Sequence, residues 1–204
     1  MDEFVKACET GDYETARRLL DDPRVDPSYD NNWAIRFASF GGHVEDVRRL
    51  LADSRVDPAD LENWAISVAS ESGHAKVVKL LLDDPRVDPS ADNNWAIRFA
   101  SFGGHVEVVK LLLTDQRVDP SADDNYAIQW ASHNGEVETV RLLLADSRVN
   151  PADDINYSIH WAAEKGHVEV VKLLLQDSRV DASEVESTNL EIQEMLAQWK
   201  YHPR

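Results

Sequence analysis

Four histidines recur along the chain at steps of 31 residues or a multiple of it, and histidine serves both as a metal ligand and as a general acid or base. They are His43, His74, His105 and His167. A metal site would need several of these rings within about 2 Å of one ion. Packed helices lie about 8–10 Å apart, so rings supplied once per repeating unit cannot converge. We therefore expect no metal site and no cofactor.

A second ladder pairs an arginine with an aspartate two residues earlier. The arginines are Arg24, Arg55, Arg86, Arg117, Arg148 and Arg179, and their aspartates run from Asp22 to Asp177. Such a ladder could recruit phosphate or acidic ligands. It could equally hold a loop in place through a local ion pair or through bonds to backbone carbonyls, and this structural role is favoured.

No catalytic constellation accompanies these ladders. The sequence has no nucleophile elbow, no glycine-rich phosphate loop and no pair of cysteines. Carboxylates are abundant, but they recur at loop positions that should face water rather than one cleft. We predict that the protein is not an enzyme.

The elements that carry both ladders form a repeat. The stretch NNWAIRFASFGGHVE occupies residues 31–45 and again residues 93–107, and glycine, alanine and a leucine pair recur every 31 residues from end to end. A fixed period of 20–50 residues is typical of a stacked repeat array. A unit this short cannot bury its apolar face alone, so stacking of neighbours must supply the core.

One unit, residues 92–122, shows the expected local structure. Asn94 can cap a short helix over 95–101, and Gly103 and Gly104 end it in a tight turn. A second helix over 105–113 carries an apolar stripe at helical spacing, and Pro120 prevents its resumption. The asparagines that precede each aromatic residue are predicted to be caps and loop braces, and the Trp or Tyr that follows is predicted to pack between units.

The charge limits the choice of partners. The formal net charge is −17, which disfavours nucleic acid and an acidic membrane surface and favours a protein partner with a basic surface. No apolar run is long enough to span a bilayer, and the N-terminus lacks the apolar core of a signal peptide. The single Cys8 fits a reducing compartment. These features predict a cytoplasmic protein, with the nucleus as an alternative, that is not secreted.

The second predicted helix resembles the ankyrin repeat. GHVEVVKLLL at residues 104–113 and 166–175 is similar to the second ankyrin helix, and the likeness recurs six times. The sequence departs from the family in its period of 31 rather than 33 and in Asn-Trp or Asn-Tyr in place of Thr-Pro. Variant repeats of this kind are similar to arrays of amoebae and large DNA viruses.

The resemblance implies an all-α fold, an ankyrin-type helix-turn-helix solenoid of six helix pairs and a C-terminal capping helix. It also implies a monomer that serves as an interaction scaffold or adaptor, and a structural role for the histidines. The expected single array over residues 1–204 divides into an N-terminal capping repeat at 1–30, repeats at 31–61, 62–92, 93–123, 124–154 and 155–185, and a capping helix at 186–204.

The resemblance also places candidate binding residues. In ankyrin arrays the two residues before the turn glycine lie on the concave face, and aromatic side chains there are favoured anchors. At these positions and at two apolar loop tips, the candidates are Phe40, Glu71, Phe102, His133, Glu164, Lys165, Leu61 and Ile155. The alternative is an engineered or purely structural module without a natural ligand, which the near-identity of the units would suit. The repeat at residues 62–92, called repeat two, argues against this alternative, because it departs from its neighbours at Ser67, Val68 and Glu71.

Overall fold

The computed structural model describes residues 2–201, without the side chains of residues 2 and 153–155. The chain divides into two units, residues 1–96 and 97–204. Unit 1 contains α1 (Asp2–Thr10), α2 (Tyr13–Leu20), α3 (Tyr29–Phe40), α4 (Val44–Ala52), α5 (Asp60–Glu71), α6 (Ala75–Leu82) and the start of α7 (Ala91–Phe102). Unit 2 continues with α8 (Val106–Thr114), α9 (Ala122–Asn134), α10 (Val137–Leu144), α11 (Asp153–Lys165), α12 (Val168–Leu174) and α13 (Leu190–Tyr201). Residues 2–201 contain no strand.

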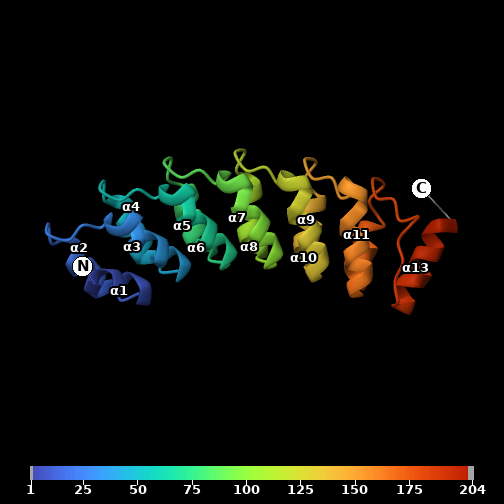
Figure 1. Ribbon diagram of the computed structural model, residues 1–204, viewed down its shortest axis with the longest axis horizontal. Helices are drawn as coiled ribbons and strands as arrows, with labels where there is room; N and C mark the ends of the chain where they lie inside the picture. The colour runs from blue at the N-terminus through green and yellow to red at the C-terminus, as the bar shows by residue number, and fades with distance from the viewer. Residues whose placement is uncertain (1, 202–204) are drawn as a thin grey trace. The chain divides into compact units, whose positions relative to one another are not determined.

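Each unit is built from pairs of antiparallel helices (Figure 1). The first helix of each pair contributes a fully buried isoleucine, except that Phe4 takes this place in α1. The second helices α4, α6, α8, α10 and α12 each contribute a fully buried leucine. In unit 1 these side chains are Phe4, Ile35, Leu50, Ile66 and Leu81. In unit 2 they are Ile97, Leu112, Ile128, Leu143, Ile159 and Leu174. The apolar stripe predicted from one repeat is therefore the core, and stacking of pairs within each unit buries it.

The turn between paired helices requires glycine for two reasons, as Gly42 shows. Its φ of +72° lies in the left-handed region, where a side chain is strained. A Cβ at this position would also lie 2.7 Å from Nδ1 of His74 in the next repeat. The glycine period in the sequence therefore reflects close packing between repeats as well as chain reversal.

A left-handed turn of three residues lies near the start of each of the first helices α3, α5, α7 and α9, within the bounds given above. In α7 it comprises Asp92, Asn93 and Asn94, with φ of 49°, 54° and 59°, so the right-handed helix begins at Trp95. An N-cap residue normally has extended backbone, and the prediction that Asn94 is a cap is therefore wrong in its geometry. Aspartate and asparagine suit the left-handed turn because their short polar side chains tolerate this conformation better than other residues.

The asparagine at the end of such a turn braces the following loop, and this part of the prediction is confirmed. The Oδ1 atom of Asn32 accepts a hydrogen bond from the backbone N–H of Asp57 at 2.8 Å. The same bond, 25 residues along the chain, joins Asn63 to Asp88, Asn125 to Asn150 and Asn156 to Asp181. These buried or half-buried amides tie each loop to the preceding repeat of the same unit.

The arginine ladder is structural, as predicted. Arg86 forms an ion pair with Asp84 at 2.6 Å and donates to the carbonyl oxygens of Val56 at 2.8 Å and Leu51 at 2.9 Å. Arg55, Arg148 and Arg179 likewise pair with the aspartate two residues earlier and donate to a valine carbonyl oxygen of the preceding repeat. Their guanidinium groups are committed to loops and are not arranged as a phosphate site.

The C-terminal helix α13 buries Ile192 and Leu196 and exposes Glu191, Glu194 and Gln198. It therefore has the apolar and polar faces predicted for a terminal cap. Within the described residues, no helix is both long enough and apolar enough to cross a bilayer.

Candidate functional site

The histidine ladder binds backbone rather than ligands. The Nε2 atom of His43 lies 3.0 Å from the carbonyl oxygen of Glu9. His74 reaches the carbonyl of Phe40 at 2.9 Å, and His167 reaches that of His133 at 2.9 Å. Each ring thus joins the end of a first helix to the next repeat, which the family resemblance implied. The described part of the chain holds no group of three or more His, Cys, Asp or Glu residues that could bind a metal ion.

Aromatic side chains line one face of the first helices in unit 1. Trp33 and Phe37, one helical turn apart on α3, stack with ring centroids 4.1 Å apart. Phe37 also lies 6.4 Å from Phe40 and 5.8 Å from Trp64 of the next repeat. Trp33, Phe37 and Trp64 are half-buried, and Phe40 is 54% exposed. The prediction that tryptophan packs between repeats is confirmed for Trp64, which contacts Phe37 and Arg36 of the preceding repeat, and part of its surface remains exposed.

Unit 2 carries a corresponding row on the first helices. Phe102, which is 41% exposed, lies 5.3 Å from Trp130. Trp130 in turn lies 5.0 Å from His133 and 5.7 Å from Trp161. These contacts bring the predicted residues Phe102 and His133 together around one indole.

Arginine side chains lie between the rings of successive repeats. The Cζ atom of Arg36 lies 5.5 Å from the ring centroid of Trp33 and 5.3 Å from that of Trp64. In unit 2, Arg98 lies 5.2 Å from the ring of Tyr126 and forms an ion pair with Asp123 at 2.7 Å. These are cation–π distances, so a guanidinium group suits the space between two rings of this face.

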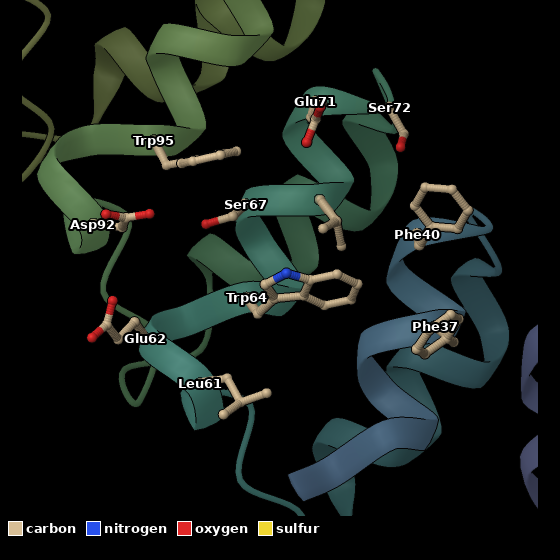
Figure 2. Close-up of a pocket in the computed structure, with 11 residues that line it drawn as sticks. Phe37, Phe40, Leu61, Glu62, Trp64, Ser67, Glu71, Ser72, Asp92 and Trp95 are labelled. Atoms are coloured by element: carbon tan, nitrogen blue, oxygen red, sulfur yellow. The ribbon is translucent and has the colours of Figure 1, made fainter.

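Repeat two interrupts the row and opens a pocket of about 580 Å³, within the range of about 300–1,000 Å³ that is typical of ligand sites. Ser67, Val68 and Glu71 stand where the flanking repeats have arginine and two phenylalanines, and the smaller Ser67 and Val68 leave the space. The lining residues are Phe37, Phe40, Leu61, Glu62, Trp64, Ser67, Val68, Glu71, Ser72, Asp92 and Trp95. Figure 2 shows Ser67 between the indole rings of Trp64 and Trp95.

The pocket is apolar and acidic. Aromatic and aliphatic side chains form most of its wall, and its charged groups are the carboxylates of Glu62, Glu71 and Asp92 (Figure 2). Among the residues that the structure describes, no lysine, arginine or histidine belongs to the lining. The site therefore has the composition to hold a cationic group next to an apolar one.

The structure brings together three residues that the sequence predicted separately. Phe40, Glu71 and Leu61 all line the pocket. Glu164 and Lys165 are exposed and lie 3.7 Å from each other, and neither belongs to the pocket lining. The side chain of Ile155 lies outside the described residues.

Phe37, Trp64 and Trp95 line the pocket, and the sequence analysis does not name them as candidates, because a position that recurs in every repeat indicates a structural role. The spacing held a usable signal. Trp33, Phe37 and Phe40 stand at i, i+4 and i+7, which places them on one helical face with the predicted anchor. The sequence shows the departures of repeat two, but their combined effect is a cavity, which depends on packing in three dimensions.

Comparison with known proteins supports the fold. A family model of ankyrin repeats (three copies) matches residues 4–94 and 94–188. Among solved structures, the chain is similar to the ankyrin repeat domain of human ASB11, with a TM-score of 0.77, 20% identity and coverage of 96% of each chain. No curated protein is found to match the chain. The all-helical helix-turn-helix fold expected from the sequence is thereby confirmed.

Proposed function

Because the chain belongs to the ankyrin repeat family, whose members are generally protein–protein interaction modules, we propose that it is a non-enzymatic scaffold or adaptor. It binds a protein partner through the aromatic face of its first helices. The observation that carries the proposal is the gathering of exposed and half-exposed rings around an acidic pocket in unit 1. Aromatic anchors in pockets dominate the energy of many protein interfaces.

The partner has a basic surface. A net charge of −17 repels nucleic acid and attracts cationic proteins at long range. The pocket adds three carboxylates at short range. Rim charges of this kind mainly increase the association rate, while the aromatic anchors slow dissociation. The chain acts as a monomer in this proposal.

The test is affinity capture from lysates of candidate hosts, followed by mass spectrometry, with three full-length proteins. They are the wild type, a double variant Phe40→Ala/Phe102→Ala, and a control variant Glu107→Ala/Glu138→Ala on exposed positions of the second helices. We expect basic proteins that the wild type and the control capture and that the double variant loses. Capture of the same proteins by all three would contradict the proposal, as would the absence of any specific capture.

A further inference from the structure

An internal arginine shows what the space between two rings of this face can bind. Arg36 is 8% exposed, and its guanidinium group lies between the indoles of Trp33 and Trp64. Its Nε and Nη2 atoms donate to the carbonyl oxygens of Asn31 and Asp30, both at 2.8 Å. The left-handed turn thus supplies acceptors and the rings supply two π faces for a single cation.

A second internal arginine adds a carboxylate to this arrangement. Arg98 lies 5.2 Å from the ring of Tyr126, and its Nη1 atom lies 2.7 Å from Oδ2 of Asp123. Asp123 is the loop-tip residue of the following repeat. The residue 31 positions before Asp123 is Asp92, which lines the pocket of repeat two.

Repeat two keeps the surroundings of this arginine and lacks the arginine itself. Ser67 occupies the position of Arg36 and Arg98. Trp64 and Trp95 remain on the two sides, and both line the pocket (Figure 2). The space that Ser67 leaves is therefore framed by the same two kinds of group, aromatic faces and a carboxylate, that hold arginine in the neighbouring repeats.

We infer that this pocket takes an arginine side chain of the protein partner, with its guanidinium group between Trp64 and Trp95 and directed toward Asp92. The inference rests on the proposed function, which it deepens by naming the group that is recognised. The phenyl groups of Phe37 and Phe40 extend the lining beyond the indoles. The partner's arginine therefore stands next to an apolar residue, which packs against this wall.

Arginine fits this site better than lysine for a geometric reason. A guanidinium group is planar, stacks on aromatic faces and donates in several directions at once, whereas an ammonium group is a compact and strongly hydrated charge. A slot between two indoles beside one carboxylate matches a flat donor. Citrulline has nearly the shape of arginine without its charge and is the matched neutral probe.

The test uses the full chain and the acetylated, amidated peptide Gly-Leu-Arg-Gly, together with its lysine and citrulline analogues. The chain has six tryptophans, so the indole Nε1–H resonances of ¹⁵N-labelled protein are assigned with the single variants Trp64→Phe and Trp95→Phe. We expect saturable shifts of these two resonances with the arginine peptide. Binding of the citrulline and lysine peptides should be weaker by roughly tenfold or more.

The variant Ser67→Arg tests the location, because it supplies the missing arginine from within the chain. It should abolish the shifts caused by the peptide while keeping the wild-type circular dichroism spectrum. Val68→Phe, which fills the same pocket without adding charge, serves as a second variant and should also block binding. Equal binding of the citrulline peptide, or unchanged binding to both variants, would overturn the inference.

Failure of the inference is distinguishable from failure of the proposed function. One outcome is that the wild type fails to bind the arginine peptide selectively and still captures proteins that the variant Phe40→Ala/Phe102→Ala loses. This result would refute the arginine pocket and leave the scaffold in place. Selective peptide binding without any specific protein capture would support the chemistry of the pocket and refute the scaffold.

Discussion

Asn134 donates its side-chain amide to the carbonyl oxygen of Phe102, with Nδ2 and O 2.8 Å apart. Histidine makes this bond to the end of the preceding first helix in three other repeats, at His43, His74 and His167. In this repeat the histidine position is Glu136, whose ionised side chain has no N–H to donate. The asparagine therefore replaces the lost donor from two residues earlier in the chain.

The first prediction tests this replacement. Asn134→Ala should lower the free energy of unfolding by about 1 kcal/mol, because the Phe102 carbonyl loses its side-chain donor. Adding Glu136→His to that variant should restore the stability. The control is Lys165→Ala, at the position equivalent to Asn134, where His167 makes the bond, and it should change the stability by less than about 0.5 kcal/mol. Urea denaturation measures all three, and equal losses in Asn134→Ala and Lys165→Ala would contradict the assignment.

The second prediction separates the two roles of the loop arginines. Arg86 binds Asp84 and also two carbonyls of the preceding repeat, whereas Arg24 has its side chain 89% exposed and an ion pair with Asp22. Arg86→Lys should cost about 1–2 kcal/mol, because lysine cannot make the ion pair and both carbonyl bonds together. Arg24→Lys should cost less than about 0.5 kcal/mol. Similar losses in the two variants would assign the stability to the ion pair alone.

The fold could be predicted from the sequence because it depends on periodic features. A buried isoleucine, a buried leucine and a turn glycine recur every 31 residues, and each has one structural role that repeats with it. The predicted helix over 105–113 differs from α8 (Val106–Thr114) by one residue at each end. The single array over residues 1–204 stays a prediction.

The candidate site could be predicted only in part, because it arises where the period fails. The place before the turn glycine predicts Phe40 and Glu71, and the apolar loop tip predicts Leu61, yet nothing in the sequence indicates that the three line one pocket. The left-handed turn was missed because asparagine before an aromatic residue is typical of a helix cap as well. Trp64 and Trp95 were interpreted as packing residues, since the sequence cannot show which side of a ring is left accessible.

The third prediction concerns a loop tip where stability and binding oppose each other. Leu61 has φ of 50°, which costs a residue with a bulky side chain about 1–2 kcal/mol, and it is 47% exposed at the pocket. Leu61→Asn should raise the free energy of unfolding by about 1 kcal/mol, because asparagine tolerates this conformation. It should weaken binding of the arginine peptide, because the apolar wall is lost.

The matched control for this position is Leu61→Ala. It removes the same apolar side chain but lacks the polar group that lets asparagine tolerate the left-handed conformation, so it should weaken binding without the gain in stability. Chemical denaturation and peptide titration measure the two effects separately. If both substitutions change the unfolding free energy equally, the left-handed conformation of Leu61 carries no strain.

The fourth prediction is a loss of stability in acid. Hydrogen bonds from the loop arginines lower the pKa of the paired aspartates Asp53, Asp84, Asp115, Asp146 and Asp177. A folded-state pKa below the unfolded value of about 3.9 means that the stabilisation is complete above that pH and is lost as the pH falls through the folded pKa. Burial raises the pKa of Asp46, so protonation of Asp46 favours the folded state in acid. This effect of one carboxyl group is smaller than the combined effect of the five paired aspartates.

The unfolding free energy should therefore be nearly constant from pH 7 to about pH 5 and fall steeply below about pH 4. Urea denaturation at pH 7, 5, 4 and 3 measures it. Asp84→Asn should be less stable than the wild type at pH 7. It should also lose less stability between pH 5 and pH 3, because the variant lacks the Asp84 carboxylate that takes up a proton in this range. Identical pH profiles for the two proteins would show that Asp84 contributes nothing to the acid sensitivity.

The last prediction asks whether the exposed phenylalanine beside the pocket is an anchor or part of the core. Phe40 is 54% exposed, and its ring packs edge-on against that of Phe37 with the two centroids 6.4 Å apart. Phe40→Ala should therefore change the unfolding free energy by less than about 0.5 kcal/mol. It should weaken binding of a captured partner by more than about 1 kcal/mol. The control is Tyr201→Ala, which removes an aromatic ring that is 83% exposed and lies outside the pocket lining; it should affect neither property. Raising the salt concentration should slow association of the partner more than it speeds dissociation, because the charges act at the rim and the ring acts in the bound state. A loss of several kcal/mol of stability in Phe40→Ala, with binding unchanged, would make the ring part of the core.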